Sequence, residues 1–128
     1  MKKQPGKQED KEVIKIPISP LGAGDGRPQE HDFRTDSAIF PLNGLLGSNI
    51  RFHLEDMNNS YALYICTGAY AISGDGSAGV AIFTPSSADL LTTNPLGKPG
   101  LYVAYPVVTL STGPVSMDSQ LLQVVALP

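Results

Sequence analysis

The stretch Asn49-Ile50-Arg51-Phe52-His53-Leu54-Glu55 decides the fold class, because apolar and polar residues alternate along its whole length. Every second residue from Ile50 is apolar, and the residues between them are charged or polar. Successive side chains of a β-strand point to opposite faces, so this period of two predicts a strand with one face in a core. A sheet with one buried and one exposed face is typical of antiparallel β proteins.

Several apolar segments on the C-terminal side of this stretch also favour strands. Residues 61–67 are apolar on both faces and predict a central strand, which residues 69–73 continue or repeat. Gly-marked and Pro-marked turns separate further strands at 79–84, 101–110 and 120–127. No segment of ten residues has the periodicity of a helix. About six to eight short strands predict an all-β fold, a single β-sandwich or jelly roll.

The composition limits the classes of function. The 128 residues carry nine Lys and Arg against twelve Asp and Glu, a net charge of -3 with no Trp. This balance argues against a nucleic-acid partner, which needs a basic face and usually stacking rings. Charged residues make up 16% of the chain, below the roughly 25% usual for soluble domains. From Met57 onward the only ones are Lys98, Asp75, Asp89 and Asp118.

This low charge favours a surface that packs against copies of the chain or against a partner, although a neutral polar surface stays open as the alternative. No apolar run is long enough for a membrane helix, and no signal peptide is recognised. We therefore expect a soluble protein made in the cytoplasm, with no membrane partner.

The N-terminal third has a different character. Residues 1–36 combine a charged tip, a short apolar segment with Pro17, and a Gly- and Pro-rich stretch. We expect them to form an extended N-terminal arm and linker, with residues 37–128 as the β-sandwich domain. The apolar residues of the arm would form its interface with a neighbour: Val13, Ile14, Ile16 and Ile18. The alternative that the arm folds back on its own domain stays open.

Candidate catalytic groups are few. Cys66 lies within a strand and is expected to be a buried, unreactive thiol. His31 stands beside Glu30 and Asp32 in a segment expected to be a solvated loop, and His53 lies on the polar face of its strand. No third metal ligand and no nucleophile with a partner base can be assigned. The sequence predicts no enzyme, and no catalytic, cofactor or metal site.

The segment from Asn49 to Pro128 resembles small β-sandwich virion proteins of bacteriophages, of the penton, decoration or accessory capsid type. The likeness rests on an order of features: Leu63-Tyr64-Ile65, a Gly turn before Val80-Ala81-Ile82, the Pro95–Gly100 loop before Leu101–Val107, and the closing strand Leu121–Leu127. The resemblance implies a structural virion component, made in the host cytoplasm and located in the virion. It would form a homo-oligomer, a trimer or pentamer, and bind other capsid or virion proteins.

A receptor- or glycan-binding β module, such as a spike or fibre tip, is the alternative function. In that case tyrosine rings would contact the ligand, and the candidates are Tyr61, Tyr70, Tyr102 and Tyr105. Rings that are exposed and gathered at one end of the fold would favour this alternative. Rings spread through a core would count against it.

Overall fold

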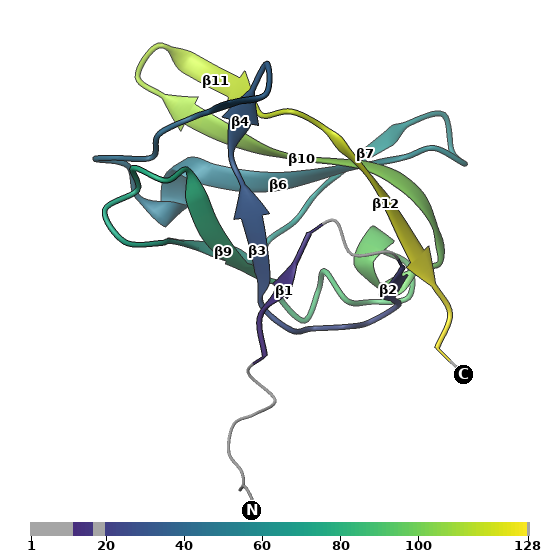
Figure 1. Cartoon of the computed structure of the whole chain (residues 1–128). Helices are drawn as coiled ribbons and strands as arrows, with labels where there is room; N and C mark the ends of the chain where they lie inside the picture. Colours follow the sequence, from purple (N-terminus) through teal and green to yellow (C-terminus); the bar gives the residue numbers. More distant parts are fainter. Residues whose placement is uncertain (1–11, 17–19, 128) are drawn as a thin grey trace, which may run out of the picture.

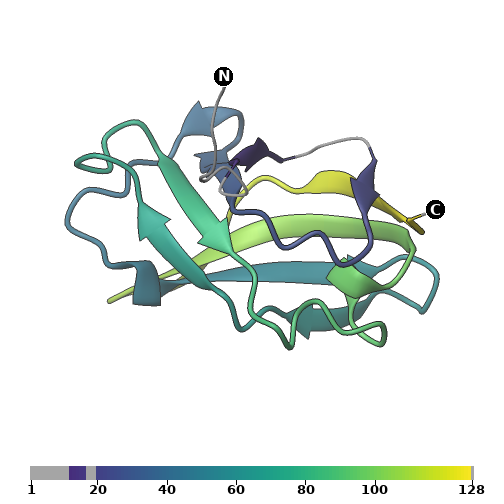
Figure 2. The same cartoon turned by 90° about the horizontal axis from the view of Figure 1, so that it is seen from below.

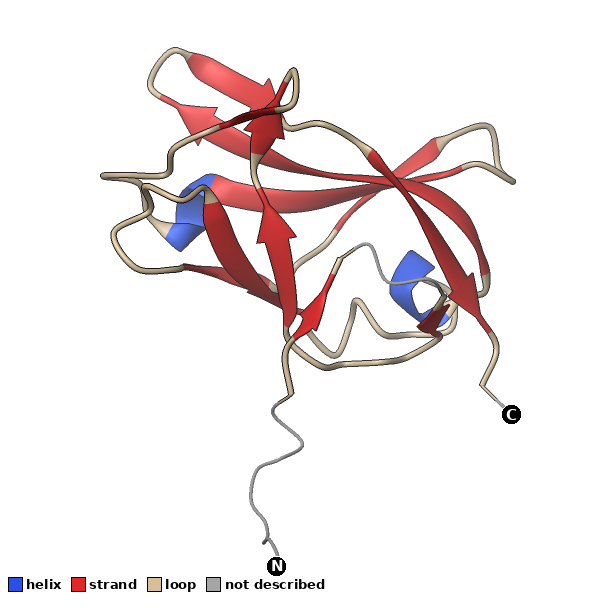
Figure 3. Ribbon diagram, viewed as in Figure 1, coloured by secondary structure: helices blue, strands red, loops and turns tan. Residues whose placement is uncertain are grey.

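The computed structural model describes residues 12–16 and 20–127, and within them the fold is all-β (Figure 1). Strands account for 47% of the described residues, which contain no helix of seven residues or more. The short 3-10 helices among the described residues are η2 (Gly47–Asn49) and η3 (Pro95–Gly97) (Figure 3). None of the described helices is long and apolar enough to cross a membrane.

The larger sheet contains the strand predicted from the opening stretch. Its strand order is β2-β12-β10-β6-β7, and β11 also pairs with β10. The β2–β12 pair is parallel and the others are antiparallel. These strands are β2 (Leu21–Gly22), β6 (Ile50–Asp56), β7 (Ala62–Ile65), β10 (Gly100–Leu110), β11 (Gly113–Ser116) and β12 (Gln120–Val125).

The smaller sheet has the order β1-β3-β9-β8. Its strands run across those of the larger sheet, as in a sandwich whose layers are rotated against each other (Figures 1 and 2). They are β1 (Ile14–Lys15), β3 (Gln29–Asp32), β8 (Ala69–Ile72) and β9 (Val80–Thr84).

A separate hairpin joins β4 (Arg34–Thr35) to β5 (Ala38–Ile39). Its turn residues Asp36 and Ser37 have positive φ angles of 50° and 68°, as a two-residue type I′ turn requires. The carboxylate of Asp118 accepts hydrogen bonds from both backbone N–H groups, at 2.9 and 2.8 Å. These two bonds hold the strained turn against the segment between β11 and β12.

The core lies between the two sheets, and the apolar side chains of β6 point into it. Ile50, Phe52 and Leu54 are buried while the residues between them are not, so the predicted strand is confirmed. Phe52 meets Phe83 of β9 with ring centroids 5.2 Å apart. The all-β sandwich predicted from the sequence is therefore confirmed.

The described part of residues 1–36 belongs to this sandwich, so its assignment to an extended arm is wrong. Strand β3 lies between β1 and β9, and β2 pairs with β12. The boundary at residue 36 is not a domain boundary. The strands concerned are two to four residues long, too short to show a period of two among glycines and prolines.

The residues assigned to the arm interface have different positions. Ile14 and Ile16 are buried in the chain's own core, so they are not available to a neighbour. Val13 is exposed, and Ile18 lies outside the described residues. The alternative that this segment folds back on its own domain is the one observed for Ile14 and Ile16.

Candidate interaction surface

The outward side of the larger sheet exposes apolar side chains from three strands. The exposed fraction is 59% for Leu121 of β12, 53% and 45% for Leu63 and Ile65 of β7, and 36% for Leu101 of β10. We call this side the outer face, formed by Arg51, His53, Glu55, Leu63, Ile65, Leu101, Val103, Tyr105, Leu121 and Gln123. Six of these ten residues are apolar or aromatic, which is typical of a surface that binds a partner.

The strand register arranges these side chains in rows. Leu121, Val103, Glu55 and Leu63 stand side by side across four strands. In the next row Tyr105, His53 and Ile65 are neighbours. Because adjacent strands are about 4.8 Å apart, each row is a continuous surface. The apolar side chains therefore form two groups, one on β10 and β12 and one on β7, with Glu55 and His53 of β6 between them.

Glu55 and His53 lie at the centre of the outer face, between its two apolar groups. The hydroxyl of Tyr105 donates to Glu55 Oε2 at 2.5 Å, and burial together with this hydrogen bond raises the pKa of Tyr105 to about 12. Partial burial lowers the pKa of His53, against the opposing effect of Glu55. At neutral pH the imidazole is therefore uncharged. An open depression of about 420 Å³ lies beside Tyr105, lined by Glu55, Val103, Ser116, Met117, Asp118 and Ser119.

Strand β7 lies at the edge of this face. The sequence predicts a central strand here, and that prediction is wrong. The described chain gives β7 one neighbour, β6, so β7 is an edge strand. Both of its faces carry apolar residues because one packs inward and the other is exposed, a pattern that cannot be told from a central strand in sequence. No charged residue occurs between Met57 and Gly74.

Asp89 fixes the end of β7. Its buried carboxylate accepts hydrogen bonds from Tyr64 Oη (2.8 Å), Thr67 N (2.8 Å) and Thr67 Oγ1 (3.3 Å) through Oδ1. Oδ2 accepts from the N–H groups of Gly68 (2.9 Å) and Ser86 (3.0 Å). Burial opposes ionisation, but the hydrogen bonds outweigh it and hold the pKa of Asp89 below its ordinary value. The carboxylate thus connects the segment between β7 and β8 to the loop after β9.

The core contains a chain of hydrogen-bonded polar side chains that includes His31. Its Nδ1 lies 2.7 Å from Tyr70 Oη and its Nε2 lies 3.0 Å from Gln29 Oε1. With an amide oxygen at Nε2, that nitrogen carries the proton, so Nδ1 accepts from the tyrosine. Burial lowers the pKa of His31 to about 3, and the ring is neutral. The expectation of a solvated loop histidine is wrong, because β3 lies between two strands.

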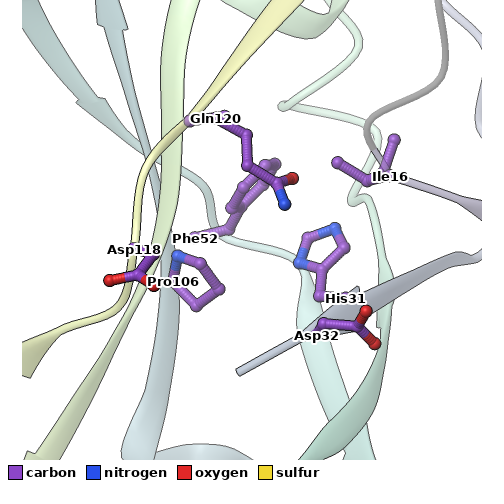
Figure 4. Close-up of a pocket in the computed structure, with 8 residues that line it drawn as sticks. Ile16, His31, Asp32, Phe52, Pro106, Asp118 and Gln120 are labelled. Atoms are coloured by element: carbon purple, nitrogen blue, oxygen red, sulfur yellow. The ribbon is translucent and has the colours of Figure 1, made fainter. Parts of the chain in front are cut away.

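A cavity of about 10 Å³ adjoins this histidine. Figure 4 draws the His31 ring and the Gln120 side chain pointing into the space between the sheets, beside Phe52 and Ile16. Its volume matches about one water molecule. This space is too small for an organic substrate. Within the part of the chain that the structure describes, no three His, Cys, Asp or Glu residues are arranged to hold a metal ion.

The four candidate tyrosines do not form one cluster. Tyr70 and Tyr102 are buried, and the Tyr102 hydroxyl donates to the carbonyl of Lys98 at 2.6 Å, so assigning these two to a ligand surface is wrong. Tyr61 is exposed at the turn before β7 and Tyr105 is half-buried on the outer face. Cys66 is buried, as predicted, and burial raises the pKa of its thiol.

The residues that sequence reasoning missed are Leu63, Ile65, Leu101 and Leu121, the exposed apolar part of the outer face. The signal that pointed toward them was the scarcity of charge after Met57. Neither a protein-family model nor a curated protein matches this chain. The function is therefore argued from this surface.

Proposed function

We propose that this protein is a structural component of a virion, of the decoration, penton or accessory type, and that it assembles through the outer face of its larger sheet. The observation that carries the proposal is the exposure of Leu63, Ile65, Leu101 and Leu121 on one face of the larger sheet. The resemblance of residues 49–128 to bacteriophage virion proteins supplies the virion context. Other capsid proteins or further copies of the chain would be the partners.

The energetics of burying these exposed residues support an assembly role. Completing the burial of a half-exposed leucine or isoleucine contributes about 1 kcal/mol. Four such residues, with Val103 and Tyr105 beside them, provide several kcal/mol before the cost of association is subtracted. Arg51 and Glu55 lie on the same face and would set the orientation of a partner. Assembly does not use Ile14 and Ile16, because the chain's own core already buries them.

A receptor- or glycan-binding module is the second candidate, and one observation favours it. The depression beside Tyr105 presents the carboxylate of Glu55, a phenol and the hydroxyls of Ser116 and Ser119. These groups bind the hydroxyls of a sugar. Tyr70 and Tyr102 no longer belong to this candidate, since both rings are in the core.

The proposal is tested on particles. Virus particles from the natural source are separated on a density gradient, and the chain and the shell protein are quantified in each fraction by mass spectrometry. We expect the chain in the particle band at a fixed ratio to the shell protein. A chain found only at the top of the gradient, apart from particles, contradicts the proposal.

A variant pair tests the surface. L101K/L121K places two charges on the outer face, whereas L46K/L91K places the same two charges at exposed leucines elsewhere. We expect L101K/L121K to lower the amount in the particle band at least tenfold and L46K/L91K to leave it unchanged. Equal incorporation of both variants removes the outer face from the proposal. Binding of L46K/L91K to a glycan array, with no particle association, favours the second candidate.

A further inference from the structure

We propose that two copies of this chain pair edge to edge through β7, antiparallel and around a twofold axis at Tyr64, to join their larger sheets into one. This inference goes beyond the proposed function, because it requires neither a virion nor a different partner. It replaces the expected trimer or pentamer by a dimer as the basic unit.

The edges of the two sheets differ in how they are protected. On β1, Lys15 Nζ binds the carboxylates of Glu30 at 2.7 Å and Asp32 at 3.0 Å, so charge lines that edge. The edge at β8 is covered by η2, where a side chain at Gly47 would collide with the carbonyl oxygen of Tyr70. Strand β2 is only two residues long. These are usual ways to prevent edge pairing.

Within the described residues, strand β7 has none of these protections. Its four residues, Ala62 to Ile65, include no charge and no proline, and its outward side chains are half-exposed. An apolar edge strand of this kind is a template for pairing with another strand. We therefore expect this edge strand to be paired with another strand when the protein functions.

The hydrogen-bond pattern identifies the free groups. Cys66 N donates to Phe52 O at 2.9 Å, and the register places Tyr64 opposite Leu54, two residues away on each strand. Hydrogen-bonded pairs alternate along an antiparallel ladder, so Tyr64 bonds to β6. The N–H and C=O groups of Leu63 and Ile65 therefore point to the open edge.

These free groups fit a second copy of the same strand. A twofold axis at Tyr64 places Leu63 of one chain opposite Ile65 of the other, and the reverse. Each pair exchanges two backbone hydrogen bonds, so four bonds satisfy all eight outward groups. The tyrosine at the axis is already held by Asp89 at 2.8 Å, which fixes the strand before pairing.

The side chains also fit a copy. On the outer face Leu63 and Ile65 would lie beside Ile65 and Leu63 of the second chain, forming one apolar cluster of four. The register places Glu55 beside Leu63 and His53 beside Ile65. The two Glu55 carboxylates therefore fall in different rows, at opposite sides of the axis. On the outer face, therefore, no like charges face each other across the pair.

Charge variants of the purified full chain test both the pairing and its register. L63K/I65K puts lysines opposite lysines across the axis, and L63K/I65E puts each lysine opposite a glutamate. Masses are measured by light scattering and sedimentation, and circular dichroism confirms that each variant is folded. L46K/L91K is the control, because it adds the same charges at exposed leucines outside β7 and the outer face.

We expect a dimer mass for the unmodified chain and for L46K/L91K, half that mass for L63K/I65K, and a restored dimer for L63K/I65E. A monomeric unmodified chain at millimolar concentration overturns the proposal, and a foreign strand then becomes the occupant of β7. A folded L63K/I65E that stays monomeric overturns the register. Since L101K/L121K reports the outer face in particles and L63K/I65K reports the edge in solution, the two proposals fail separately.

Discussion

Replacement of Asp89 by Asn tests the buried carboxylate that accepts five hydrogen bonds. The substitution keeps the size of the side chain and exchanges one acceptor oxygen for an NH2 group. If nitrogen takes the Oδ2 position, it faces the N–H groups of Gly68 and Ser86; at the Oδ1 position it faces the N–H of Thr67. The second orientation is favoured because it leaves only one backbone N–H without an acceptor.

The expected loss follows from these contacts. An unsatisfied buried N–H costs about 1–3 kcal/mol, and the remaining bonds fall from about 1.5–3 kcal/mol with a charged acceptor to about 1 kcal/mol. Relief of the buried charge offsets part of this loss. We expect D89N to lower the free energy of unfolding by about 3 kcal/mol and Tm by about 10 °C.

Urea unfolding followed by far-ultraviolet circular dichroism measures the loss, since the chain has no tryptophan. D75N is the matched control, because Asp75 makes its hydrogen bonds to Ser77 in an exposed turn. We expect D75N to change stability much less. A D89N variant as stable as D75N would refute the argument that the five bonds to this carboxylate stabilise the segment between β7 and β8.

Acid gives a second, independent test of the same carboxylate. The pKa of Asp89 in the fold lies below its ordinary value of 3.8, so the stabilisation is complete above that pH and is lost as pH falls through the lower, native value. The difference between the unmodified chain and D89N should be constant from neutral pH to about pH 5 and shrink below 3.8. A difference that persists unchanged at pH 2.5 would contradict an ionised carboxylate in the native state.

Three further substitutions test the core and a turn. The pKa of His31 is about 3 in the fold, against an ordinary value of 6.5. Between these two pH values the unfolded chain binds a proton on His31 that the folded chain does not, so the free energy of unfolding decreases as pH is lowered, by about 1.4 kcal/mol per pH unit. H31F should flatten that slope in urea titrations at pH 4–6, and an unchanged slope would exclude His31 as its source. Y70F leaves His31 Nδ1 without its donor and should cost about 1–3 kcal/mol, whereas Y61F, at an exposed ring, should be neutral; equal effects would count against the buried chain of hydrogen bonds. S37G relieves a φ of +68° and should raise the free energy of unfolding by about 0.5 kcal/mol. S73G changes a residue that is not among those with positive φ and should lower the free energy of unfolding. A Tm that is higher for S73G than for S37G would contradict strain in the turn.

The sequence predicted the parts of the fold that a local pattern determines. The alternation from Ile50 to Leu54 reports burial residue by residue, because one face of β6 packs on the core. Buried Cys66 followed from its position within an apolar strand. The scarcity of charge after Met57 correctly indicated an exposed surface that lacks a charged coat.

The remaining errors concern pairing between distant segments. His31 looked like a solvated residue because Glu30, Asp32 and nearby glycines surround it in sequence. Its burial comes from β9, some fifty residues later, and no local pattern encodes that pairing. For the same reason Ile14 and Ile16 looked like a free arm. Strand β7 was mistaken for a central strand because an inward and an exposed apolar face read alike.

The four charges after Met57 explain why the outer face is apolar. Asp89 is buried under five hydrogen bonds, and Asp118 holds the Asp36-Ser37 turn. Asp75 caps its own turn through Ser77, and Lys98 binds Asp56 at 3.1 Å. Each charge has a partner within the fold, and none comes from β7, β10 or β12. The charges of the outer face therefore come from β6 alone, so β7 reaches the surface without the charge that prevents one sheet edge from joining another.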